Sequence, residues 1–184
     1  MPSTESPARR RLLDSAGDLF YTEGIHRVGI DRIIASADIA KATFYKHFPS
    51  KDDLVCAYLR ERLARHQNAV AQVRETARSL DFLYALFDAV GSLACGPGYR
   101  GCPFINAAAE FPDPGHPVRE VIGEFRTWFV SVLRTALIES GRPAPDETAY
   151  LLMVLRDGLA VGIELDNVQD VQATVRAMVR QILD

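Results

Sequence analysis

Lysine is scarce in this 184-residue chain, and its distribution is uneven. Of the 21 basic residues, three are lysines, at positions Lys41, Lys46 and Lys51, and the others are arginines. Lysines confined to one short segment place compact, flexible positive charges there, an arrangement that suits contacts to phosphate groups. The first unusual feature of the composition therefore favours a polyanion as partner.

Cysteine is also scarce, and long uncharged apolar runs are absent. Cys56, Cys95 and Cys102 form an odd set without metal-type spacing, which predicts reduced thiols in a cytosol. No apolar run reaches about 18 residues without a charge, so we expect no membrane span and no membrane partner. No apolar segment follows the polar start MPSTESPARRR, so no secretory signal is predicted. These absences predict a cytoplasmic globular protein.

The net charge of −3 hides an asymmetry between the two parts of the chain. Residues 1–51 contain eight basic and six acidic residues, a net charge of +2, whereas residues 52–184 contain thirteen and eighteen, a net charge of −5. A basic N-terminal part on an acidic remainder favours one orientation towards a polyanion.

Apolar residues recur with helical spacing along nearly the whole chain, and no strand pattern is present. Ser50 and Asp53 form a capping-box pattern after Pro49, which predicts the start of a long helix. The expected helices cover residues 8–23, 30–37, 41–48, 51–77, 80–95, 102–111, 117–140, 146–165 and 168–183. The sequence therefore predicts an all-α protein of about nine helices.

Residues 24–51 predict two short helices joined by a tight turn. Phe44 and Phe48 are expected to face inward, which leaves the lysines and other polar residues of the second helix on its outer faces. This pattern is typical of a helix-turn-helix that binds DNA.

The segment Lys41–Leu54, KATFYKHFPSKDDL, and the helix ending in FYTEG at Gly24 resemble the DNA-binding domain of the TetR family of bacterial transcriptional regulators. The resemblance covers roughly residues 8–66. It implies a DNA-binding domain over residues 6–66, with the helix-turn-helix motif at about 29–48, and a ligand-binding and dimerisation domain over residues 67–184.

The resemblance also implies the partners: a second copy of the chain, a double-stranded DNA operator and an unknown small-molecule effector. The expected function is that of a repressor released from a near-palindromic operator by this effector. The alternatives are an activator, an architectural DNA-binding dimer without effector, a helical enzyme and a purely protein-binding helical dimer. No nucleophile–base pair, metal-ligand spacing or phosphate-binding glycine loop is present, so no catalytic residue, metal or cofactor is predicted.

Three positions depart from the family pattern. Gly29 opens the second helix without a hydroxyl group, Asp38 replaces the usual turn glycine, and Ala40 replaces a capping serine. The missing cap at Ala40 is expected to cost about 1 kcal/mol of local stability.

The residues predicted to bind DNA belong to the second and third helices and the start of the fourth. Tyr45 is interpreted as a phosphate contact, and Thr43 as a contact to a thymine methyl group, a base edge or a phosphate. His47 is either a donor to a phosphate or a residue at the rim of the interface. The full set is Gly29, Ile30, Lys41, Ala42, Thr43, Tyr45, Lys46, His47 and Lys51.

An effector pocket is predicted among the fifth to eighth helices, near Asn106 and Trp128, although most of its candidate residues would also suit a plain core. The candidates are Phe87, Phe104, Asn106, Phe125, Trp128, Phe129 and Tyr150. Cys95 and Cys102, with Arg100 nearby, suggest either an oxidant sensor or buried thiols that fill gaps, and the second interpretation is favoured.

The last helix carries an apolar seam with spacings of three and four residues, formed by Val168, Val171, Val175, Met178 and Ile182. Such a seam packs either within one chain or against a second copy, and we favour a dimer interface together with the preceding apolar helix. On this interpretation Val175→Asp should produce monomers.

Overall fold

The computed structural model describes residues 6–93, 96 and 98–184, and every regular element within them is an α-helix. The helices are α1 (Pro7–Glu23), α2 (Ile30–Ala37), α3 (Lys41–His47), α4 (Lys51–Thr76), α5 (Ser79–Leu93), α6 (Pro103–Glu110), α7 (Pro117–Glu139), α8 (Pro145–Leu165) and α9 (Val168–Leu183). The all-α class is confirmed, and the helix ends lie within two residues of the predicted ones. The predicted end of the fifth helix, Cys95, lies outside the described residues.

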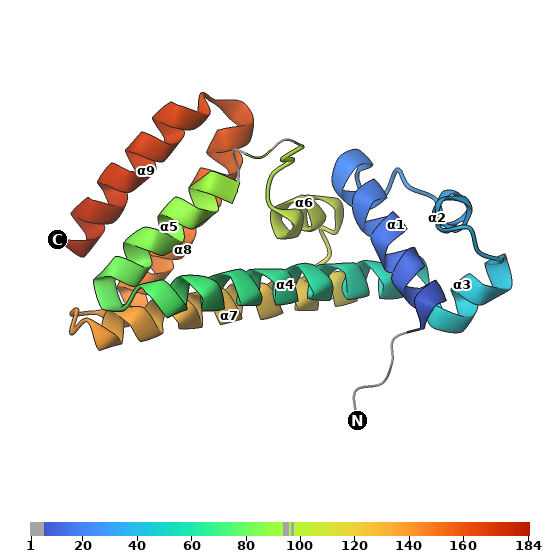
Figure 1. Cartoon of the computed structure of the whole chain (residues 1–184), viewed down its shortest axis with the longest axis horizontal. Coiled ribbons are helices and arrows are strands. Elements are labelled where there is room, and N and C mark those ends of the chain that lie inside the picture. The colour runs from blue at the N-terminus through green and yellow to red at the C-terminus, as the bar shows by residue number, and fades with distance from the viewer. Residues whose placement is uncertain (1–5, 94–95, 97) are drawn as a thin grey trace.

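α1, α2 and α3 form a small head at one end of the molecule (Figure 1). α1 packs against both α2 and α3. Ile33 of α2 and Phe44 of α3 are fully buried, and Phe48 closes the same core. The buried side of α1 consists of Leu12, Leu13, Ala16, Gly17 and Phe20. The head therefore has an apolar core that fixes the outer surface of α3.

The turn between α2 and α3 contains a left-handed residue that is not glycine. Asp38 has φ 49° and ψ 60°, and its N–H donates to the carbonyls of Ile34 and Ala35. A residue with a β-carbon pays about 1 kcal/mol for this conformation, and aspartate tolerates it better than most. Asp38 thus takes the place of the turn glycine, as its position in the sequence predicts.

The N-terminus of α3 has no side-chain cap, because Ala40 occupies the capping position. Ala40 has φ −76° and ψ 149°, an extended conformation that a capping serine also adopts. We expect Ala40→Ser to raise the free energy of unfolding by about 1 kcal/mol, since the new oxygen accepts an N–H of the first turn. Urea unfolding measures this gain. Ala35→Ser, at an exposed position inside α2, is the matched control, and an equal gain there would contradict the capping explanation.

α4 is a single long helix that connects the head to the rest of the chain (Figure 1). Its start is fixed by the predicted capping box, in which Ser50 Oγ accepts the Asp53 N–H at 3.1 Å and Asp53 Oδ2 accepts the Ser50 N–H at 3.0 Å. The helix packs against α1 near one end and against α5 and α7 along the body. The predicted boundary between residues 66 and 67 falls inside this helix.

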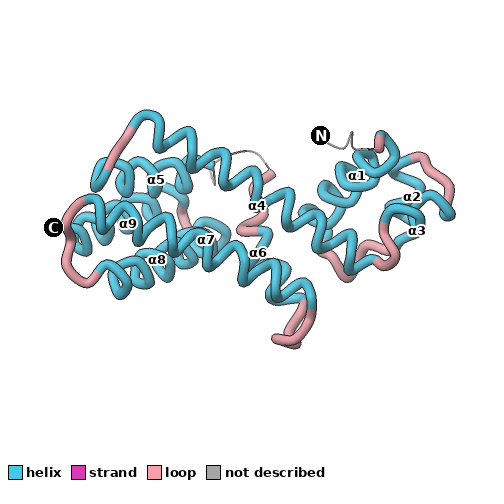
Figure 2. Tube along the Cα trace, turned by 90° about the horizontal axis from the view of Figure 1, so that it is seen from below, coloured by secondary structure: helices cyan, strands magenta, loops and turns pink. Residues whose placement is uncertain are grey.

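The body consists of α5 to α9 packed around the second half of α4 (Figure 2). α7 packs against α4, α5 and α8, and α9 packs against α5 and α8. α6 is a short helix between the head and the rest of the body in both views (Figure 1, Figure 2). None of the helices, as far as the chain is described, combines the length and the apolar character that a bilayer span requires.

Candidate functional site

The predicted DNA-binding residues come from the start of α2, from α3 and from the start of α4. Phe44 faces the core, so the opposite side of α3 is presented to solvent. The exposed members of the predicted set are Gly29, Lys41, Ala42, Tyr45 and Lys46, and the half-buried members are Ile30, Thr43, His47 and Lys51. The residues on the outer side of α3 therefore share one accessible surface.

The three lysines of this surface differ in their surroundings. Lys41 Nζ lies 3.0 Å from Asp31 Oδ1, and this hydrogen bond raises the pKa of Lys41. Lys46 has no ion-pair partner among the residues that the structure describes. Lys51 Nζ lies 6.0 Å from the centre of the Phe20 ring, and burial lowers the pKa of Lys51. Lys46 is therefore the lysine whose charge is most available to a phosphate.

A cavity of about 300 Å³ lies in the body, on the side of α4 that faces α7 and α8. Arg62, Arg65, His66 and Ala69 line it at helical spacing along α4. The remaining lining residues are Tyr21, Val90, Tyr99, Gly101, Cys102, Pro103, Phe125, Phe129, Arg156 and Ala160. This cavity is the main candidate for a small-molecule site, because it combines aromatic walls with a few polar groups.

Arg156 of α8 is buried in the wall of this cavity, with 4% of its surface exposed. Its Nη1 lies 3.1 Å from Asp157 Oδ1, and its Nη2 donates to Cys102 Sγ at 3.1 Å. The guanidinium also lies 5.1 Å from the centre of the Phe125 ring. Cys102 itself is 3% exposed, which fits its interpretation as a buried thiol, and its cationic neighbour is Arg156 rather than the expected Arg100.

His66 lies against the aromatic rings of Phe104 and Phe125, with ring centroids 5.9 and 5.5 Å away. Burial, reinforced by the positive charges of Arg156 and Arg62, lowers the pKa of His66 to about 4. The imidazole is therefore neutral at pH 7.

The low pKa of His66 makes folding stability depend on pH. In the unfolded chain His66 is protonated below about pH 6.5, whereas in the folded chain it stays neutral down to about pH 4. The unfolded state therefore binds the proton first, and the free energy of unfolding decreases as the pH falls through this window. We expect the free energy of unfolding to decrease by about 2 kcal/mol between pH 7 and pH 5 from this group. Urea unfolding of the wild type and of His66→Gln at both pH values isolates the effect, because the variant lacks it. Equal losses in the two proteins would show that His66 titrates normally.

The structure does not bring the seven predicted effector residues together. Phe125 and Phe129 line the cavity, and Trp128 packs against each of these two rings. Phe104 stacks on Phe125, with the ring centroids 4.0 Å apart. Asn106 instead donates to the Arg100 carbonyl at 2.6 Å, on the side of α6 that faces the head. Tyr150 is 61% exposed on α8 and does not reach the cavity.

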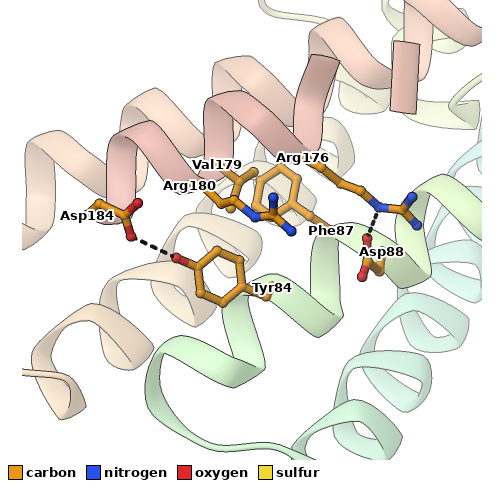
Figure 3. A pocket seen from close by; sticks show the side chains of 7 residues that line it. All are labelled: Tyr84, Phe87, Asp88, Arg176, Val179, Arg180 and Asp184. Atoms are coloured by element: carbon orange, nitrogen blue, oxygen red, sulfur yellow. Dashed lines mark hydrogen bonds and ion pairs between the residues drawn. The ribbon is translucent and has the colours of Figure 1, made fainter. Parts of the chain in front are cut away.

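Phe87 lies in a different groove, between α5 and α9 (Figure 3). Two of its polar pairs are internal. Arg176 Nε lies 2.6 Å from Asp88 Oδ1, and the Tyr84 hydroxyl lies 3.5 Å from Asp184 Oδ1 (Figure 3). Arg180 also lines the groove and forms no ion pair with another described residue. Phe87 therefore belongs to a groove that is separate from the cavity around Arg156.

Two sets of hydrogen bonds tie the head to the elements around the cavity. The hydroxyl of Tyr21, a residue of α1 that lines the cavity, donates to the Gly101 carbonyl at 3.0 Å and accepts the Arg100 N–H at 2.9 Å. At the end of α6, the Glu110 carboxylate accepts the N–H groups of Ile25 and His26 at 2.8 and 2.5 Å. The loop before α6 is thus hydrogen-bonded to α1, and the end of α6 is hydrogen-bonded to the turn between α1 and α2.

α8 and α9 together carry an exposed apolar face. Its exposed members are Leu151, Val154, Val161, Leu165 and Met178. With Gly158, those on α8 repeat at spacings of three and four residues, which makes a continuous stripe along one side of the helix. A β-carbon on Gly158 would meet nothing within 4 Å, so a second helix can approach closely there. A continuous exposed apolar face of this kind is typical of a surface that another molecule covers.

The predicted seam on α9 lies mostly inside the chain. Val175 is 6% exposed because α9 packs against α5 and α8, and Val168, Val171 and Ile182 are half-buried in the same contacts. Met178, 44% exposed, is the one member that belongs to the apolar face. A charge at Val175 is therefore expected to disturb the fold of one chain, which corrects the expectation that Val175→Asp would only separate two copies.

Sequence reasoning missed Tyr21, Arg62, His66 and Arg156 as residues of the cavity. One signal was available, because Arg156 interrupts a helix that is otherwise apolar on nearly all sides. A charged residue in such a place is either paired or lines a cavity.

Known proteins resemble the chain at both the level of sequence and the level of structure. The profile for "Bacterial regulatory proteins, tetR family" matches residues 12–58. The crystal structure of SCO4454, a TetR-family transcriptional regulator from Streptomyces coelicolor, is 37% identical and superimposes with a TM-score of 0.91, covering 96% of this chain and 94% of that one.

Two curated relatives from Escherichia coli K12 are also similar. The transcriptional regulator UidR is 30% identical over 93 residues, which are 50% of this chain and 46% of UidR, so the chain spans about half of that relative. The transcriptional repressor NemR is 24% identical over 142 residues, which are 76% of this chain and 71% of NemR.

Proposed function

The chain belongs to the TetR family of bacterial transcriptional regulators, and from this premise we propose that it is a homodimeric repressor that a small molecule releases from DNA. In this proposal residues 6–66 bind a near-palindromic operator in the cytoplasm, and residues 67–184 hold the effector and the dimer interface. Proteins of this family are regulators and not enzymes, which sets the helical-enzyme alternative aside.

The observation that carries the proposal is the exposed outer side of α3. Phe44 is fully buried and fixes the helix on the head, while Lys46 and Tyr45 project from the opposite side. A short helix held in this way by a helix-turn-helix enters the major groove, and its cations contact the phosphate backbone.

We expect Lys46→Ala to weaken binding to all DNA sequences and to reduce the salt dependence of binding. Each lost phosphate contact lowers the slope of log K against log salt by about 0.9, and a dimer loses two such contacts. Gel-shift titrations from 50 to 200 mM salt, with the DNA upstream of the chain's own gene, measure this slope. An unchanged affinity and slope would show that α3 does not contact DNA as proposed.

Two further variants sharpen this measurement. Lys41→Ala should lower the slope less than Lys46→Ala does, because Lys41 already pairs with Asp31 at 3.0 Å and must exchange this carboxylate for a phosphate. Thr43→Ala should leave the slope unchanged and alter the preference between operator sequences, because a base contact is specific and a phosphate contact is not.

Regulation by an effector is supported by the position of the cavity. Tyr21 belongs to the head, lines the cavity and holds the loop at Gly101 through its hydroxyl group. A ligand that displaces this loop therefore acts on α1 directly. A ligand that prefers the DNA-incompetent arrangement by about 2 kcal/mol would change operator affinity some thirtyfold.

The dimer is supported by the apolar face of α8 and α9. Val154 and Leu151 are 53% and 56% exposed in a single chain, and a self-complementary interface would cover both. NemR, a relative whose aligned part covers 76% of the chain, is named a repressor, which supports repression over activation for this chain.

A further inference from the structure

We infer that the cavity around Arg62 and Arg156 binds an organic anion, a carboxylate carried on an apolar or aromatic body. The inference rests on the proposed function, because it names the chemical class of the effector at the same site. Three features of the cavity support an anion: the charges of its wall, the incomplete pairing of Arg156 and the aromatic rings beside Arg156.

The wall of the cavity offers positive charge and hydrogen-bond donors without negative charge. Three arginines line it, and no acidic side chain does so among the described residues. Burial raises the pKa of Tyr99 to about 12 and lowers that of His66 to about 4. At pH 7 the imidazole and the phenol, which donates to the Ala160 carbonyl at 3.4 Å, are therefore both uncharged. The formal charges in the wall are therefore all positive, so they repel a cationic ligand and attract an anion.

The pairing of Arg156 is incomplete. Asp157, its one carboxylate partner among the described residues, is shared with Arg126, whose Nη1 lies 2.6 Å from Asp157 Oδ2. The thiol of Cys102 is a weak acceptor, and Arg156 Nε has no hydrogen-bond partner within the described part of the chain. A buried donor without a partner is costly, so a ligand oxygen that accepts from Arg156 gains more here than at an exposed site.

Arg62 of α4 supplies a second charge in the wall of the cavity. No carboxylate of the described residues lies within ion-pair distance of its guanidinium, which rests instead 5.3 and 5.2 Å from the ring centres of Tyr21 and Tyr58. Arg62, His66 and Arg156 all line this one cavity. An anion bound in the cavity is therefore attracted by two arginines whose charges are not fully used within the protein.

The body of the ligand follows from the apolar part of the wall. Phe125 and Phe129 lie 6.0 Å apart in a stacked arrangement, and Phe104 backs Phe125 at 4.0 Å. A cavity of about 300 Å³ between these rings and α4 accommodates a small substituted aromatic molecule. An inorganic anion would leave the aromatic wall uncovered, which favours an organic one.

Three probes of the same shape test the charge preference. They are 4-isopropylbenzoate, 4-isopropylbenzamide and 4-isopropylbenzamidine, which carry charges of −1, 0 and +1. Calorimetry at pH 7 on the full chain measures binding, and the single tryptophan, Trp128, which packs 5.8 Å from Phe129, gives an independent fluorescence signal. We expect the benzoate to bind at least about tenfold more tightly than the amide, and the amidine more weakly than either.

Variants of the two arginines locate the binding. Arg62→Gln should reduce the preference for the benzoate over the amide to about twofold or less, and Arg156→Met should do the same if that variant stays folded. Arg60→Gln is the matched control, since Arg60 lies on the same helix, pairs with Glu124 at 3.1 Å and does not line the cavity. A preference that survives Arg62→Gln would overturn the assignment, as would equal binding of the three probes or binding of none of them.

Operator affinity, measured by gel shift in the presence of each probe, separates the anion inference from the proposed function. If the benzoate binds with the expected preference and leaves operator affinity unchanged, the anion site stands and regulation through it fails. If the amide or the amidine binds best and weakens operator binding, regulation stands and the anion inference fails.

Discussion

Val154→Asp is expected to be a folded monomer whose operator affinity is lower than that of the wild type by about two orders of magnitude. Val154 is 53% exposed in the single chain, so the charge costs the protomer little. In a two-fold symmetric interface the substitution occurs twice, and each unpaired carboxylate would be buried against the partner at a cost of several kcal/mol. A single head then reads one half-site instead of two.

Sedimentation at micromolar concentration and a gel shift measure the two effects in the same protein. Ile138→Asp is the matched control, because Ile138 is 49% exposed on α7, outside the apolar face of α8 and α9. This control should remain dimeric and bind the operator normally. A monomeric wild type with full operator affinity would refute the dimer, and a dimeric Val154→Asp protein would place the interface elsewhere.

Asp157→Asn is expected to lower the free energy of unfolding by about 3 kcal/mol. Asp157 is the one carboxylate beside the buried guanidinium of Arg156, among the residues that the structure describes. Its neutralisation leaves that charge without compensation in a site from which water is largely excluded. The loss should therefore far exceed that of an exposed ion pair.

Urea unfolding of four proteins resolves this effect. Arg126→Gln, which removes the exposed partner of Asp157, should cost less than about 1 kcal/mol. The double variant Arg156→Met/Asp157→Asn should recover most of the loss, since no charge is then left buried. Similar costs for Asp157→Asn and Arg126→Gln would mean that Arg156 is compensated by something other than Asp157.

The head is the part of the molecule that the sequence predicted most completely. The helix boundaries in and beside the head have local causes. The left-handed Asp38 ends α2, and the Ser50–Asp53 capping box begins α4. Both causes can be recognised without tertiary structure. The separation of α3 into a buried side at Phe44 and an outer side at Lys46 follows from helical spacing alone.

The cavity was not predictable in the same way. Its residues come from α1, α4, α5, the loop before α6, the first residue of α6, α7 and α8, and their meeting depends on how these helices pack. Periodicity identified the aromatic residues of the body but could not decide which of them face a cavity. Tyr150 shows the difficulty, because α8 is apolar on nearly all sides and its sequence does not distinguish the inner side from the exposed one.

The seam on α9 shows a related difficulty. Val175 has the spacing of an interface residue, yet α5 and α8 of the same chain already cover it. Heptad spacing indicates that a helix is covered along one side, and it does not say by which helix.

The continuity of α4 has a mechanical consequence. Arg62, at the cavity, and Lys51, at the start of the helix, are separated by eleven residues of uninterrupted helix, or about 17 Å at 1.5 Å per residue. If α4 tilts by about 10° about the cavity, its Lys51 end moves by roughly 3 Å. This displacement is close to the rise of about 3.4 Å between successive base pairs. In the proposed symmetric dimer the two displacements would add, and the recognition helices would lose their match to grooves about 34 Å apart. On this proposal, a ligand that tilts α4 slightly is enough to change the distance between the two heads.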